Sequence, residues 1–261
     1  MTDPAGKAQL LRRLHQGPEI LVLVNVWDVA SARTIAALPA CRAIATASWS
    51  IAASLGMPDH EQLTRTDMIA VVGRIVAGVD LPVTADLESG YGATPAEVGE
   101  TIAGAIGAGI AGCNLEDQNR PLTEAAARIE AARNAAGAEG VPIVLNARVD
   151  MPVATPEQLD QAVTRARAYL EAGADCVFPI RIRDAAILEQ FVARVAAPVN
   201  AFGYPGGPSV AQLEAIGVAR VSFGPGPYGA ALLELRRAGE TLLAGGDVHP
   251  AMAFRPPTDN D

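Results

Sequence analysis

The chain has 261 residues, of which 50% are hydrophobic and 4% aromatic, and its formal net charge is −9. This acidic balance argues against nucleic acid as a partner, because phosphates attract a basic surface. The N-terminal stretch has no apolar signal-peptide core, and no apolar run approaches the ~20 residues of a membrane helix. We therefore expect a cytoplasmic protein with no membrane partner.

Strand-like and helical segments alternate along the chain. A short amphipathic helix is predicted over residues 7–16. Apolar runs of strand length follow at residues 19–25, 42–47, 81–86, 111–116, 141–148, 175–179, 197–201 and 219–223. The helices predicted between and after them cover residues 28–38, 66–79, a segment that starts at the capping box of Thr94 and Glu97, 123–136, 155–172, 185–195, 209–216 and 228–244.

The strand-like runs are apolar throughout rather than alternating, which is typical of parallel strands buried on both faces. Eight such units in a chain of this length predict an α/β fold, a (β/α)8 TIM barrel. We expect one domain over residues 1–261, with the barrel over about 18–244 and a loose Pro-rich tail over 245–261. A doubly wound open sheet is the alternative, but residues 25–28 lack its Gly-rich dinucleotide fingerprint.

Two carboxylates, Asp86 and Glu88, lie where the third predicted strand ends. Such a pair is costly after an apolar strand unless a cation or an ion-pair network compensates it. In barrels of this kind the active site lies at the C-terminal ends of the strands, which places Glu116 nearby. Clustered carboxylates suit Mg²⁺ or Mn²⁺. An ion-pair network with Arg148 is an equally good interpretation of the spacing alone.

Arg148 follows the fifth predicted strand and is a candidate clamp for a carboxylate or phosphate. Its alternative role is a salt bridge to Glu116. The segment 46–50, which contains Thr46 and Ser48, could offer hydroxyl and backbone N–H groups to an anion, or could form an ordinary turn.

Four motifs resemble those of the isocitrate lyase / phosphoenolpyruvate mutase superfamily. They occur in the order of that family, and the resemblance covers about residues 21–235. The motifs are Ser-Leu-Gly-Met-Pro-Asp (54–59), Asp-Leu-Glu-Ser-Gly-Tyr-Gly (86–92), Asn-Leu-Glu-Asp-Gln (114–118) and Asn-Ala-Arg-Val-Asp (146–150).

The resemblance implies a (β/α)8 barrel that forms a homo-oligomer, usually a tetramer and possibly a dimer, and often exchanges a C-terminal helix between subunits. It also implies binding of Mg²⁺ and of an oxo-acid or its enolate. By position, Asp86 would ligate the metal, while Glu88, Glu116 and Asp59 would hold metal-bound waters. The candidate residues are Asp86, Glu88 and Glu116 for the metal, Arg148, Glu116 and Asp59 for catalysis, and Trp27, Thr46, Ser48, Trp49, Arg148 and Asn200 for substrate.

Two departures from the family bear on the reaction. Its lyases carry a lid with a catalytic cysteine after the fourth strand, and its mutases and phosphonopyruvate hydrolases place lysine and asparagine there. Here residues 119–122 lead directly into a helix and contain no cysteine or lysine. After the sixth strand, where lyases often have glutamate and mutases histidine, this chain has Ile180.

We therefore expect a Mg²⁺-dependent carbon–carbon lyase or decarboxylase that acts on a small oxo- or hydroxy-(di)carboxylate through an enolate. Phosphonopyruvate hydrolase or mutase-type P–C chemistry is the first alternative. A specialised biosynthetic enzyme and a catalytically silent oxo-acid-binding barrel are the others.

Overall fold

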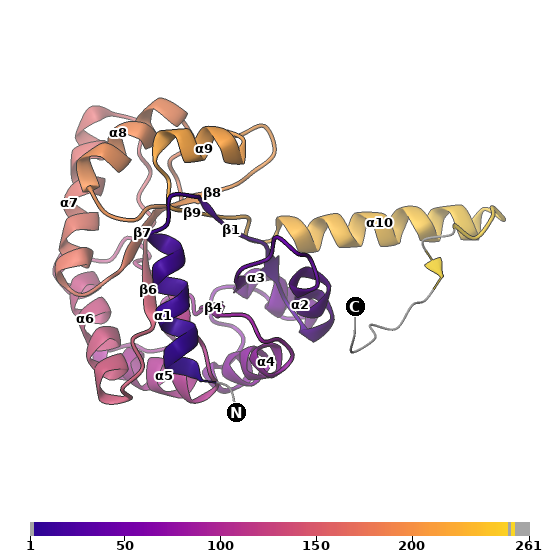
Figure 1. Cartoon of the computed structure of the whole chain (residues 1–261), viewed down its shortest axis with the longest axis horizontal. Helices are drawn as coiled ribbons and strands as arrows, with labels where there is room; N and C mark the ends of the chain where they lie inside the picture. Colours follow the sequence, from indigo (N-terminus) through magenta and orange to yellow (C-terminus); the bar gives the residue numbers. More distant parts are fainter. Residues whose placement is uncertain (1–2, 250–251, 254–261) are drawn as a thin grey trace.

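The computed structural model describes residues 3–249 and 252–253 of the chain. Its parallel strands form a barrel with helices around the outside (Figure 1), as the sequence predicts. The strands are β1 (Leu21–Leu23), β2 (Asn25–Val26), β3 (Ile44–Thr46), β4 (Val83–Asp86), β5 (Gly112–Glu116), β6 (Val144–Val149), β7 (Cys176–Pro179), β8 (Asn200–Phe202) and β9 (Arg220–Ser222).

The strands from β2 to β7 pair consecutively, and β1, β9 and β8 pair in a second sheet. The two sheets are joined by a parallel bridge between Val177 and Val199 and by the continuous chain between β1 and β2. The single first strand predicted over residues 19–25 is thus divided in two. Its first half, β1, pairs with β9, and its second half, β2, pairs with β3. This segment therefore lies between the last strand and the next strand of the chain and closes the barrel.

The predicted helices are present with boundaries shifted by a few residues. Capping boxes at Thr94 and Thr155 start two of them, and a proline follows each cap at the first helical position. The helices are α1 (Pro4–His15), α2 (Val29–Ala36), α3 (Ser48–Ser54), α4 (Arg65–Ala77), α5 (Pro95–Gly107), α6 (Leu122–Ala138), α7 (Pro156–Glu171), α8 (Ala185–Val195), α9 (Val210–Ile216) and α10 (Gly226–Leu243).

Helix α3 was not predicted from the sequence. It begins immediately after β3, where the segment 46–50 had been interpreted as an anion-binding stretch or an ordinary turn. Its first residue, Ser48, lies at the C-terminal end of the strands, so the helix directs its N-terminus toward the end of the barrel that carries the acids.

The core has two parts. The larger one fills the space between the strands and the surrounding helices. A smaller one lies inside the barrel, where Leu11 and Leu14 of α1 pack against Leu21, Leu23 and Val144. Helix α1 therefore closes the N-terminal end of the barrel and leaves only the opposite end open for a ligand.

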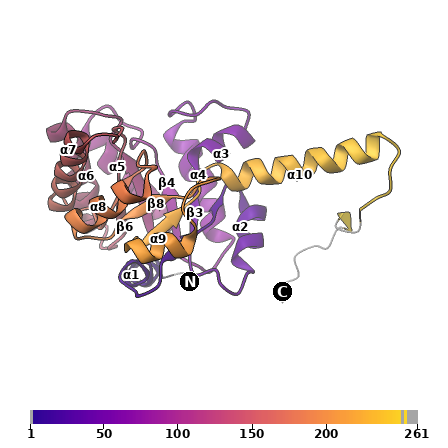
Figure 2. The same ribbon diagram turned by 90° about the horizontal axis from the view of Figure 1, so that it is seen from above.

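Helix α10 projects away from the barrel (Figure 2) and has no buried residue. Residues 245–249 of the predicted loose tail form neither helix nor strand, and residues 250–251 and 254–261 lie outside the described residues. Within the described chain no helix is both long and apolar enough to cross a membrane.

Candidate active site

Asp86, at the end of β4, makes three hydrogen bonds with residues of β3 and α3. Its Oδ2 atom accepts hydrogen bonds from the Ser48 backbone N–H at 3.1 Å and from Ser48 Oγ at 2.9 Å. Its backbone N–H donates to Thr46 Oγ1 at 2.9 Å. Thr46 and Ser48 were predicted to bind substrate, which stays a prediction; in the structure Ser48 holds the Asp86 carboxylate and Thr46 holds the Asp86 backbone.

Glu88 lies only two residues further on but is bonded to a different set of partners. Its side chain is 3% exposed; Oε2 accepts from the Glu61 N–H at 2.6 Å, and Oε1 accepts from the Tyr91 hydroxyl at 2.5 Å. Burial raises the pKa of Glu88 to about 7, despite these hydrogen bonds. A carboxyl group with this pKa changes charge near neutral pH.

The backbone of this stretch adopts unusual conformations. Glu88 and Tyr91 have positive φ values of 49° and 52°, and Gly90 has φ 99°. A Cβ atom at position 90 would lie 2.9 Å from the Val98 side chain, so glycine is required there. Strained backbone of this kind is common at functional sites, where the surrounding structure stabilises it.

Glu61, which no motif singled out, organises this turn. Its Oε1 atom accepts from the backbone N–H groups of Ser89 and Tyr91 at 3.0 and 2.9 Å, and from Ser89 Oγ at 2.7 Å. It reaches the turn from the loop before α4. The sequence gives no signal for this contact, because it joins two loops across the end of the barrel.

Arg148 forms the salt bridge to Glu116 that was its alternative role, and a second one to Asp150. Its Nη1 atom lies 2.6 Å from Glu116 Oε2, and its Nε atom donates to Asp150 Oδ1, also at 2.6 Å. Burial raises the pKa of Glu116 to about 7, although the charge of Arg148 opposes the shift. The Nη2 atom has no partner among the described residues and is available to a substrate carboxylate.

The short turn after β5 is fixed by a buried network around Asp117. Its Oδ2 atom accepts from Arg165 Nη1 at 2.9 Å and from the Tyr169 hydroxyl at 2.6 Å. Its Oδ1 atom accepts from the backbone N–H groups of Asn119 and Asp150 at 2.9 and 3.2 Å. The segment that stands where the family has a lid is therefore a short turn tied to α7.

A cavity of about 200 Å³ opens at this end of the barrel. It brings together five of the predicted site residues: Ser48, Trp49, Asp59, Asp86 and Arg148. The other residues that line it are Asn25, Ala47, Asn114, Phe178, Ile180, Phe202, Ser222, Gly224 and Pro225.

The remaining predicted site residues do not line this cavity. Glu88 and Glu116 are held by the partners given above. Thr46 and Asn200 are fully buried, and Asn200 Nδ2 donates to Ser222 Oγ at 3.2 Å. Trp27 packs edge-on against Tyr228 of α10, with ring centroids 5.0 Å apart.

The three predicted metal ligands are Asp86, Glu88 and Glu116. They do not form a metal-binding group, and among the described residues no three acidic, histidine or cysteine side chains do. The donor set nevertheless fits a cation that keeps most of its water and takes one or two carboxylates, as Mg²⁺ does. Asp86 and Asp59 line the same cavity, and Asp59 Oδ1 is buried with no hydrogen-bond partner in the described chain.

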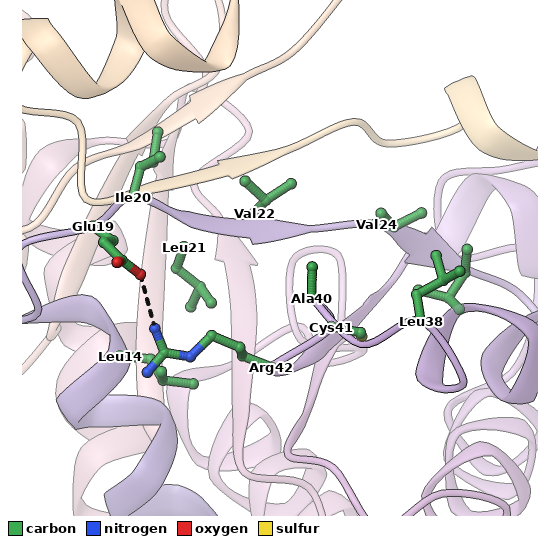
Figure 3. A pocket seen from close by; sticks show the side chains of 11 residues that line it. Leu14, Glu19, Ile20, Leu21, Val22, Val24, Leu38, Ala40, Cys41 and Arg42 are labelled. Carbon is green, nitrogen blue, oxygen red and sulfur yellow. Dashed lines mark hydrogen bonds and ion pairs between the residues drawn. The ribbon is translucent and has the colours of Figure 1, made fainter.

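A larger groove of about 330 Å³ lies elsewhere, beside β1 (Figure 3). Its lining is mainly aliphatic, including Leu21, Val22 and Leu38, and an ion pair between Arg42 and Glu19 lies at its edge. This groove lacks the two carboxylates, Asp59 and Asp86, that line the cavity of about 200 Å³, and it does not lie at the C-terminal ends of the strands. We therefore assign the active site to the cavity of about 200 Å³.

A parallel α/β barrel closed at one end by a helix, with a cavity that contains a carboxylate and a guanidinium at the open end, has the arrangement of barrel enzymes, whose sites lie at the C-terminal ends of the strands. The family model for phosphoenolpyruvate phosphomutase matches residues 11–243. The chain belongs to this family, within the isocitrate lyase / phosphoenolpyruvate mutase superfamily, as its motifs suggested.

Three relatives illustrate the range of this family. An uncharacterized protein of Mycobacterium tuberculosis is 34% identical over 236 residues, which cover 88% of this chain and 87% of the relative. Oxaloacetate decarboxylase 2 of Pseudomonas fluorescens is 30% identical over 82% of this chain and 77% of its own length. The crystal structure of 2,3-dimethylmalate lyase superposes with a TM-score of 0.84 at 28% identity, covering 96% of this chain and 92% of that one.

Proposed function

We propose that this protein is a Mg²⁺-dependent lyase or decarboxylase that breaks a carbon–carbon bond beside the carbonyl or hydroxyl group of a small carboxylate, through an enolate. The observation that carries the proposal is the single cavity that Asp86, Asp59 and Arg148 share. The names of two relatives, an oxaloacetate decarboxylase and a 2,3-dimethylmalate lyase, agree with this reaction class.

The roles follow from the contacts. Ser48 and Thr46 hold Asp86 with its second oxygen, Oδ1, left for a cation. Arg148 is oriented by Glu116 and Asp150, so its Nη2 atom can bind the substrate carboxylate. When bound, Mg²⁺ would stabilise negative charge that develops on the substrate oxygen. Glu116 does not line the cavity, so its role is to orient Arg148 from behind the lining.

The direct test is a panel of 2-methylisocitrate, 2,3-dimethylmalate, oxaloacetate and related 2-oxo and 2-hydroxy acids, including monocarboxylates with an alkyl substituent, assayed for pyruvate or glyoxylate release with and without Mg²⁺. We expect turnover of at least one acid that disappears when the metal is chelated. A folded protein that turns over none of them would contradict the proposal.

The metal role of Asp86 has its own test. We expect Asp86→Asn to abolish both turnover and the calorimetric Mg²⁺ signal, because the amide cannot supply the negative charge that the cation needs. Asp160→Asn, which changes an exposed carboxylate on α7, serves as the matched control and should leave both unchanged. Mg²⁺ binding that survives Asp86→Asn would remove Asp86 from the metal site.

The second candidate is P–C chemistry on phosphonopyruvate, which the name of the matching family model favours. The short turn fixed by Asp117, with no lysine at residues 117–122, makes it the weaker candidate. Phosphate release or phosphoenolpyruvate formation from phosphonopyruvate would decide in its favour. Tight oxalate binding with no activity on any of these acids would instead indicate a catalytically silent oxo-acid-binding barrel, or a specialised enzyme with another substrate.

We further propose that the protein works in the cytoplasm as a homo-oligomer, a tetramer or a dimer, in which α10 packs on a neighbouring subunit. The support is that α10 has no buried residue and that Leu232, Leu233 and Leu235 on it are 46%, 47% and 68% exposed. Such a run of exposed leucines is costly in water and is typical of an interface.

A further inference from the structure

The active-site cavity has two chemically different walls. Strands β2 to β6 and the segments after them contribute mostly polar groups, including Ser48, Asp86 and Arg148, whereas Phe178, Ile180 and Phe202 come from β7, β8 and the residues after β7. The end of β9 and the residues after it complete the lining between the two walls with Ser222, Gly224 and Pro225. The division is abrupt, because Phe178 is the cross-strand partner of Arg148. A volume of about 200 Å³ corresponds to roughly seven water molecules, so the occupant is a small acid.

The charges that line the cavity suffice for one substrate carboxylate. Arg148 is the only cation among the described residues that line it, and two carboxylates already pair with it. The other charged groups in the lining are Asp59 and Asp86, which repel anions unless a cation covers them. Mg²⁺ held by these acids would lie on the same polar wall as Arg148 and would serve the same end of the substrate.

An arginine that does not line the cavity, Arg183, packs against the apolar wall. The Arg183 guanidinium is 4.6 Å from the centre of the Phe202 ring and 4.5 Å from that of Tyr204. The Tyr204 hydroxyl donates to the Arg183 carbonyl oxygen at 2.7 Å, which connects the loops after β7 and β8. Stacking on two aromatic rings occupies this cation and fixes Phe202 in the wall.

We propose that Phe178, Ile180 and Phe202 form a subsite for an alkyl group, so that the substrate is a small 2-oxo or 2-hydroxy acid with an apolar substituent where related dicarboxylates carry a second carboxylate. A carboxylate against this wall would lose its water without gaining a cation, whereas an alkyl group gains by leaving water. Ile180 and Phe202 are then specificity-determining residues. The inference rests on the proposed function and deepens it.

The test compares two ligands of equal shape, 2-oxoglutarate and 5-methyl-2-oxohexanoate, which differ in a terminal carboxylate and a terminal isopropyl group. Binding is measured by calorimetry in saturating Mg²⁺, with oxalate as the reference ligand. We expect oxalate to bind and the isopropyl acid to bind at least roughly tenfold more tightly than its carboxylate counterpart.

Two failures are distinguishable. If oxalate binds but 2-oxoglutarate binds as tightly as the isopropyl acid or more tightly, the alkyl subsite is wrong while the oxo-acid site stands. If oxalate does not bind at all, the proposed function fails, and the subsite fails with it.

Substitutions at Ile180 test whether this residue determines the preference for the isopropyl acid over 2-oxoglutarate. Ile180→Lys supplies the missing cation and should reverse the preference toward 2-oxoglutarate, while Ile180→Thr, which is smaller and polar but uncharged, should only reduce it. Ala186→Lys adds the same charge at an exposed position of α8 and should leave the preference unchanged. A preference that is the same in wild type, Ile180→Lys and Ile180→Thr would overturn the role of Ile180.

Discussion

His15 lies buried in the last turn of α1, with Nδ1 at 2.8 Å from the Leu11 carbonyl oxygen and Nε2 without a partner in the described chain. Burial, with the charges of Arg220 and Arg12, lowers the pKa of His15 to about 3. The folded protein therefore keeps this imidazole neutral at a pH at which the unfolded chain protonates it.

The sign of the effect follows from proton linkage. Between pH 6.5 and about 3 the unfolded state binds a proton at His15 that the folded state does not bind. The free energy of unfolding therefore decreases as the pH falls through this range. From pH 7 to pH 5 the loss is about 2 kcal/mol. We expect urea unfolding to show that His15→Gln loses less stability than wild type over this interval. Equal losses in the two proteins would show that His15 does not titrate on unfolding.

Arg220 on β9 is fully buried inside the barrel. Its Nη2 atom donates to Asn114 Oδ1 at 3.2 Å, and its Nε and Nη1 atoms have no partner among the described residues. Burial lowers the pKa of Arg220 to about 10, so it remains charged at neutral pH. A buried charge that no carboxylate contacts is unfavourable for folding.

We therefore expect Arg220→Met to raise the free energy of unfolding by about 1 to 3 kcal/mol. Asn114 Oδ1 keeps its hydrogen bond from Asn146 Nδ2 at 2.7 Å, so the substitution leaves that acceptor satisfied. Calorimetric unfolding of the two proteins provides the measurement. A clear loss of stability in Arg220→Met would mean that the guanidinium contributes favourably to folding.

At the scale of elements, the turn after β5 and helix α7 act as one unit. Tyr169 of α7 is 1% exposed, and its hydroxyl donates to Asp117 and accepts from Arg165. Tyr169→Phe removes both bonds and leaves a buried carboxylate with fewer donors. We expect a loss of about 1 to 3 kcal/mol in urea unfolding.

The matched control for this substitution is Tyr204→Phe. The Tyr204 hydroxyl makes one hydrogen bond of normal length, and this bond is exposed, so water can replace it. If both variants lose the same stability, the network around Asp117 is not what fixes the turn.

At the scale of the whole molecule, the exposed leucines of α10 predict association. We expect the double variant Leu232→Glu, Leu235→Glu to lower the molar mass measured by light scattering, because charged side chains cannot be buried in an apolar interface. Thr241→Glu adds charge to the same helix without removing a leucine and should leave the mass unchanged. A wild-type protein that is monomeric at all concentrations would contradict the proposal.

Much of this molecule could be predicted from local sequence patterns. Continuously apolar runs identify parallel strands, since both faces of each strand are buried, and the caps at Thr94 and Thr155 identify helix starts from a spacing of three residues. The rule that barrel sites lie at the C-terminal ends of strands then selected Asp86, Ser48 and Arg148, which line one cavity.

Only the tertiary structure decided what each of these groups contacts. Asp86 and Glu88 are neighbours in sequence, yet Asp86 is bonded to Ser48, while Glu88 is bonded to Glu61 and Tyr91. The apolar wall opposite them likewise joins strands that are distant in the chain. Local sequence determines whether a segment is a strand or a helix, but hydrogen bonds and burial in the site depend on loops that meet only when the barrel closes.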